Sequence, residues 1–116
     1  MVDSATSDQG IAQLQMLEQN VQNILLQKQQ IQSQHVEVEN AIEEINKATG
    51  NVYKVVGNIM LAANKDELKK ELESKKEVLA LRLKTIEKQE LQLKEKANKL
   101  QEDVVAKLQK EKGVKQ

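Results

Sequence analysis

Several residue types that compact enzymes commonly use are missing from this chain of 116 residues. It has no cysteine, no proline, no phenylalanine and no tryptophan, and it has one tyrosine. The absence of cysteine excludes disulfides and thiolate chemistry, and the near absence of aromatic side chains argues against an ordinary globular core. Charged residues make up 31% of the chain, a composition typical of a coiled coil or a long helix when heptad periodicity accompanies it.

Groups that could perform catalysis or hold a metal are also scarce. His35 is the only histidine, so a multi-histidine metal site is excluded. No Gly-Lys-Ser or Gly-Lys-Thr follows Gly50 or Gly57, which excludes a phosphate-binding loop. The acidic pair Glu43-Glu44 has no further acid at a fixed spacing and is interpreted as part of a solvated helix face. The sequence therefore predicts a protein that is not an enzyme and that binds no cofactor and no metal.

The sequence also argues against membrane and nucleic-acid partners. Its longest mostly apolar run, from Val55 to Ala63, is far shorter than the roughly 18 residues that span a bilayer, and the N-terminal segment MVDSATSDQG lacks the features of a signal peptide. The lysines of the C-terminal half alternate with glutamates and have no aromatic residues among them for base stacking. We therefore predict a cytoplasmic protein.

Two segments carry the periodicity of long helices. The first is predicted over residues 11–49 and the second over residues 65–112, where an apolar residue recurs every seven positions from Leu72 to Leu100. Lys28 and His35 fall in the first seam, and polar residues there commonly fix register or partner choice. Asn64 followed by Glu67 predicts a capped start of the second helix. The apolar seam positions of the first segment are Leu14, Leu17, Val21, Ile24, Ile31, Val38, Ile42 and Ile45.

The two helices are expected to fold back on each other as an antiparallel coiled coil, with Ile45 near Leu68 and Leu14 near Leu100. Residues 1–10 are predicted to form a flexible tail and residues 113–116 a short C-terminal tail. This register leaves the last turns of the second helix unpaired beyond Ile11.

The segment between the helices, residues 50–64, predicts a β-hairpin. VYKVV and IMLAA flank Gly57-Asn58, a two-residue loop that suits a type I′ or II′ turn. Both faces of this hairpin are largely apolar, and a lone hairpin is marginal in water. Hairpins of several chains are therefore expected to join in one sheet or closed barrel; the alternative is a hairpin that folds back on the base of its own coiled coil. The residues assigned to this assembly are Val52, Tyr53, Val55, Val56, Gly57, Asn58, Ile59, Met60 and Leu61.

This arrangement resembles the beta-class subunit of archaeal prefoldin. The most specific part of the resemblance is NVYKVVGNIML at residues 51–61, followed by a capped helix with Arg82 and KTIEKQE at residues 84–90. It covers about Leu14 to Leu100, and the single hairpin matches the beta class, because the alpha class carries two.

The resemblance implies a hexamer of two alpha-class and four beta-class subunits, in which hairpins assemble into β-barrels and coiled coils project from them. It implies ATP-independent capture of non-native proteins at the distal ends of the coiled coils and their delivery to a group II chaperonin.

Apolar residues near the far ends of the helices are the candidates for client contact, because exposed apolar surface is a generic recognition element for unfolded chains. For Leu14, Leu17 and Leu100, packing in the seam is the competing interpretation. Met16 lies off the seam and has a flexible thioether side chain. The full set is Ile11, Leu14, Met16, Leu17, Leu100, Val104, Val105 and Leu108.

Two other functions remain open at this point. The chain could be a structural scaffold whose coiled coil sets a distance and whose hairpin joins another sheet, without affinity for unfolded protein. A basic-helix nucleic-acid binder is a weaker alternative, which predicts steeply salt-dependent binding.

Overall fold

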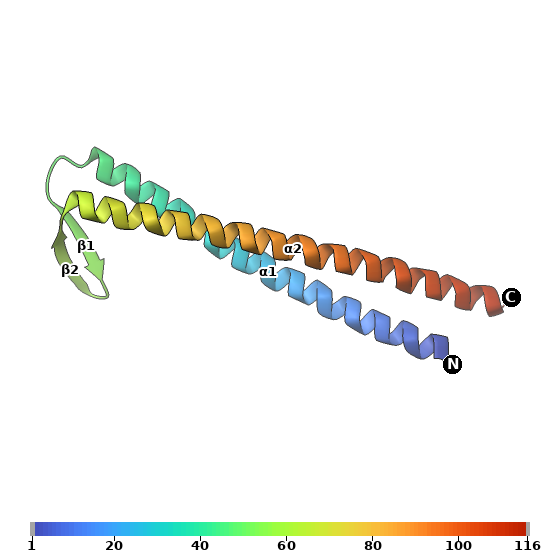
Figure 1. Ribbon diagram of the computed structural model, residues 1–116. Coiled ribbons are helices and arrows are strands. Elements are labelled where there is room, and N and C mark those ends of the chain that lie inside the picture. Colours follow the sequence, from blue (N-terminus) through green and yellow to red (C-terminus); the bar gives the residue numbers. More distant parts are fainter. Residues whose placement is uncertain (1, 116) are drawn as a thin grey trace. The chain divides into compact units, whose positions relative to one another are not determined.

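The computed structural model describes residues 2–115, with side chains described over residues 8–110. The elements follow in the order α1 (Val2–Lys47), β1 (Val52–Val56), β2 (Ile59–Ala63) and α2 (Lys65–Lys115) (Figure 1). The chain divides into two units, which we call the terminal unit (residues 1–27 and 86–116) and the hairpin unit (residues 28–85). In each unit a part of α1 runs antiparallel to a part of α2. The predicted fold class, two long antiparallel helices connected by one β-hairpin, is confirmed.

Heptad spacing explains why the helices pair. In the hairpin unit, Val38 and Ile45 of α1 and Leu79 of α2 are buried, and the remaining seam residues are half-buried. In the terminal unit, Ile86 and Val104 of α2 are buried. Spacings of three and four residues place these side chains on one stripe of each helix. Each helix pair thus has a narrow apolar core, and most other positions face solvent.

The helix ends differ from the predicted boundaries at the chain termini. The segment over residues 2–10, predicted as a flexible tail, belongs to α1, and α2 continues through Gly113 to Lys115. Residues 2–9 contain neither proline nor glycine, so nothing in them stops a helix, and a single glycine inside a helix costs only about 1 kcal/mol relative to alanine. Residues 1 and 116 of the two predicted tails lie outside the described residues.

The ends that flank the hairpin are fixed by specific hydrogen bonds. The Asn64 Oδ1 atom accepts hydrogen bonds from the backbone N–H groups of Asp66 at 2.9 Å and Glu67 at 3.2 Å, which is the N-cap that the sequence predicts. At the other helix end, the Lys65 Nζ atom donates a hydrogen bond to the Ala48 carbonyl oxygen at 2.9 Å. A side chain of α2 thus satisfies a carbonyl just beyond the end of α1, which the sequence did not reveal.

The two strands pair in the predicted register. Val52 lies opposite Ala63, and Val56 lies opposite Ile59, so Gly57 and Asn58 form a two-residue loop. Gly57 has a φ of +60°, and none of the described non-glycine residues has a positive φ. A positive φ at the first loop position alone is the pattern of a type II′ turn. The glycine is therefore required here, because a Cβ atom disfavours this conformation.

Candidate assembly and client-binding surfaces

The hairpin exposes most of its apolar side chains. Six large ones, which we call the hairpin surface, are between 50% and 67% exposed: Tyr53, Val55, Val56, Ile59, Met60 and Leu61. Val52, by contrast, is half-buried. Because the sheet has two strands, the outer edge of each strand also presents backbone groups that no neighbouring strand covers.

The register assigns these side chains to two faces, because residues directly opposite each other in an antiparallel pair share a face. We call the first the helix-side face; its Val52 and Lys54 are half-buried. We call the second the outer face, and its side chains are exposed. The helix-side face consists of Val52, Lys54, Val56, Ile59, Leu61 and Ala63, and the outer face of Tyr53, Val55, Met60 and Ala62.

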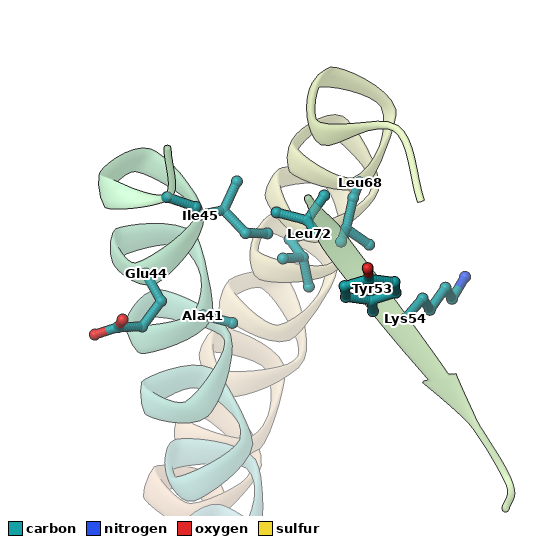
Figure 2. Close-up of a pocket in the computed structure, with 9 residues that line it drawn as sticks. Ala41, Glu44, Ile45, Tyr53, Lys54, Leu68 and Leu72 are labelled. Atoms are coloured by element: carbon teal, nitrogen blue, oxygen red, sulfur yellow. The ribbon is translucent and has the colours of Figure 1, made fainter. Parts of the chain in front are cut away.

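The base of the hairpin is attached to the helices of its own chain. The Lys54 Nζ atom lies 2.6 Å from the Glu71 Oε1 atom of α2. Beside this ion pair, a mostly apolar groove of about 450 Å³ separates β1 from the helix pair (Figure 2). In Figure 2, the Leu68 and Leu72 side chains lie near the strand and Ala41 points from α1 toward α2, whereas Glu44 points away from them. The groove is lined by Ala41, Glu44, Ile45, Ala48, Val52, Tyr53, Lys54, Leu68 and Leu72.

The alternative of a hairpin that folds back on the base of its own coiled coil is thus observed in part. The hairpin does contact its own coiled coil, yet this contact covers only the base of one face. Six exposed side chains remain on the hairpin surface, so the requirement for an additional partner stands.

The second candidate surface lies in the terminal unit, where the helices approach each other closely. Gly10 is buried, and a Cβ atom built on it would lie 2.7 Å from the Val104 Cγ2 atom. Val104 itself is only 6% exposed. The prediction that the second helix is unpaired beyond Ile11 is therefore wrong at Val104, because α1 begins at Val2 and Gly10 makes room for the Val104 side chain.

The other predicted client-binding residues fall into two groups. Leu14, Leu17 and Leu100 are half-buried in the seam, as the packing interpretation expects. We call the exposed residues Ile11, Val105 and Leu108 the terminal surface. Met16 is the most exposed residue of the predicted set at 65%.

Helical spacing indicates which of these residues share a side. A shallow groove of the terminal unit is lined by Glu18 and Gln22 of α1 together with Lys94 and Asn98 of α2. Each of these residues directly follows a seam residue. Ile11 follows Gly10 and Val105 follows Val104, so the same spacing places both on this side of the helix pair. Met16 precedes the seam residue Leu17 and belongs to the opposite side.

Comparisons with known proteins agree with this architecture. The family model described as "Prefoldin subunit" matches residues 8–111. The chain belongs to the prefoldin subunit family. A similar solved structure is the crystal structure of the prefoldin beta subunit from Thermococcus strain KS-1, with 32% sequence identity and a TM-score of 0.81. This match covers 87% of the present chain and 90% of the other. No curated protein matches the chain.

These findings confirm the resemblance stated above, and the chain is a beta-class prefoldin subunit of the archaeal type. Prefoldins are chaperones that assemble from several subunits and are not enzymes. Among the described residues, no group of three or more histidines, cysteines or acids could hold a metal ion, and no helix is apolar over enough of its length to cross a bilayer.

This prefoldin subunit also has exposed apolar residues that were not predicted from the sequence. They lie outside both the hairpin surface and the terminal surface. A signal was present in Ile24-Leu25-Leu26, where three successive apolar residues cannot all face one narrow seam. These exposed residues are Leu26, Val36, Val78, Leu81 and Leu91.

Two polar side chains occupy seam positions of this prefoldin. His35 is half-buried, and its Nδ1 atom lies 3.0 Å from the Glu39 Oε1 atom one turn later. Glu90 is buried at a seam position of the terminal unit, and its Oε2 atom lies 3.9 Å from the Lys94 Nζ atom. Both positions interrupt the apolar seam, and the sequence predicts this for His35.

Proposed function

We propose that this chain is the beta-class component of a hetero-hexameric prefoldin with two alpha-class and four beta-class subunits. Its hairpin surface joins the hairpins of neighbouring subunits in a β-barrel. The observation that carries this proposal is a hairpin that exposes six large apolar side chains on two faces. Several such side chains, at roughly 1.5–3 kcal/mol each when fully buried, provide a substantial driving force for assembly.

The proposed activity is ATP-independent capture of non-native proteins in the cytoplasm, followed by delivery to a group II chaperonin. Exposed Ile11, Val105 and Leu108 support client contact at the terminal surface. Met16 is a further contact, because its thioether side chain adapts to differently shaped clients. Leu14, Leu17, Leu100 and Val104 then act mainly in the seam and reach a client only when the helix ends separate.

The experiment is dilution of a chemically unfolded model protein, without nucleotide, into the complex of this chain with an alpha-class subunit. Light scattering reports aggregation of the model protein. We compare the native complex with one that carries Ile11→Gln, Val105→Gln and Leu108→Gln. Loss of three partly exposed apolar contacts of roughly 1 kcal/mol each should weaken client binding about a hundredfold.

The matched control carries Leu26→Gln, Leu81→Gln and Leu91→Gln, which remove equally apolar and even more exposed side chains from the same helices. This control should protect the client as well as the native complex does. If the control loses protection and the terminal variant keeps it, the client-binding surface lies elsewhere. If the native complex assembles and gives no protection, the scaffold function is the better description.

A further inference from the structure

The helix-side face of the hairpin is incompletely covered within one chain. At its base, Val52, Lys54 and Ala63 are half-buried beside the helices. Near the turn, Val56 and Ile59 of the same face are 52% and 61% exposed. The chain's own helices thus cover the base of this face and leave the turn end open.

Closure into a barrel does not remove this exposure. In a closed barrel one face of each strand points to the interior and the other points outward. The Lys54–Glu71 ion pair ties the helix-side face to α2, so the outer face with Val55 and Met60 is the one that can enter the barrel interior. Val56 and Ile59 then need cover from a helix pair of another subunit.

The groove beside β1 offers such cover, because it is mostly apolar and open, and Val52, Tyr53 and Lys54 line its hairpin side. Resting on the hexamer proposed above, we propose that two copies of this chain pair along β1 in antiparallel orientation about a two-fold axis. The Val56 and Ile59 side chains of each copy then lie at the groove of the other. The occupant of each groove is therefore the turn end of the partner copy's hairpin.

Which strand of the second copy pairs with β1 decides whether the turn ends are covered. If β1 pairs with β2 of another copy in antiparallel fashion, the bases of the two hairpins lie side by side, and both turn ends stay uncovered. If β1 pairs with β1 of another copy, the turn end of one lies beside the base of the other. The full overlap of the two strands places Val52 opposite Val56 of the second copy, on the same face as the groove.

The same register accounts for the position of the Lys54–Glu71 ion pair. Lys54 is the middle residue of β1 and would face its counterpart at the two-fold axis, where two like charges directly opposite each other are unfavourable. The Glu71 carboxylate 2.6 Å away supplies each lysine with an opposite charge. An isologous contact of this kind is the commonest arrangement between identical subunits, and it leaves the outer edge of β2 for an alpha-class hairpin.

Disulfide cross-linking tests this proposal directly, because the native chain has no cysteine. Chains with Val52→Cys and longer, tagged chains with Val56→Cys are mixed and assembled with a cysteine-free alpha-class subunit. Directly opposite residues in an antiparallel pair have Cα atoms about 4.5–5.5 Å apart, within the range that a disulfide spans. After mild oxidation, we expect a heavier product that contains one chain of each length.

The matched control replaces the second variant by Ala63→Cys, which tests the base-to-base arrangement. A disulfide between Val52→Cys and Ala63→Cys of separate chains, without one between Val52→Cys and Val56→Cys, overturns the proposal. A complex of normal size that forms neither disulfide also overturns it and leaves the proposed hexamer intact. Failure of the native chains to assemble, measured by light scattering after size-exclusion chromatography, contradicts the hexamer and the pairing together.

Discussion

The hairpin surface and the terminal surface present apolar side chains in different ways. On the hairpin, exposure extends over both faces of a ribbon whose strand edges are open. In the terminal unit, Gly10 and Val104 close the seam, and exposed residues lie beside it. A large surface with directional backbone groups suits a permanent partner of defined geometry, whereas a few side chains on closed helices suit weak contacts with many partners. In the function proposed above, this difference assigns assembly to the hairpin surface and client capture to the terminal surface.

Charges on the outer face of the hairpin should have the largest effect on the two surfaces. Val55→Lys with Met60→Lys should abolish assembly with the alpha-class subunit. Burial of two such side chains contributes roughly 3–6 kcal/mol, so association should weaken at least about a hundredfold. Sedimentation velocity of the mixed subunits measures this, and circular dichroism should report unchanged helix content.

A control with Val78→Lys and Leu81→Lys places the same charges on exposed positions of α2 in the hairpin unit. Assembly should persist in this variant. If the control dissociates and the hairpin variant does not, the assembly surface belongs to the helices.

The next largest effect concerns closure of the terminal unit. Gly10→Ala gains about 1 kcal/mol in helix propensity, but its Cβ atom would meet the Val104 Cγ2 atom at 2.7 Å. Overpacking of this kind costs roughly 1–3 kcal/mol. In a Val104→Ala background, where that atom is absent, the same substitution should be stabilising.

A double-mutant cycle on thermal unfolding measures this coupling, which we expect to be about 1–3 kcal/mol. A pairing of Gly10→Ala with Val105→Ala serves as the control, because Val105 is exposed, and it should give additive effects. Additive effects for Gly10 and Val104 as well would mean that the helices do not close at this point.

The smallest effect is expected for the ion pair that attaches the hairpin to its own helix. Lys54→Met removes an ion pair whose two side chains are 42% and 56% exposed, and ion pairs so accessible to solvent contribute about 0–1 kcal/mol. The thermal unfolding temperature of the isolated chain should therefore change by a few degrees at most. Glu95→Met on the solvated side of α2 is the control. A large loss of stability in Lys54→Met alone would contradict the small contribution expected of this ion pair.

Much of the architecture follows from local chemistry and could be predicted. Heptad spacing identifies the seams, Gly57-Asn58 identifies the turn, and Asn64 identifies the start of α2. These features depend on residues close in sequence, so the pattern contains enough information to place them.

What could not be predicted depends on contacts between distant residues. Gly10 was interpreted as part of a flexible tail, because its effect depends on the approach of Val104 from α2. The link from Lys65 to Ala48 and the ion pair from Lys54 to Glu71 likewise join residues 17 positions apart. Exposed Leu81 and Leu91 were missed since helical periodicity identifies the buried stripe better than it explains apolar residues outside it.

The hydrogen bond from Lys65 to the Ala48 carbonyl has a consequence for how such subunits can diversify. It joins the two positions that flank the hairpin at 2.9 Å, so the helices are connected at this point independently of the strands. Residues 49–63 therefore form a segment that can be exchanged while this link between the two helices is retained. Exchange of this segment between subunits offers a route to new partner choice, while the helices on either side of it keep their own pairing.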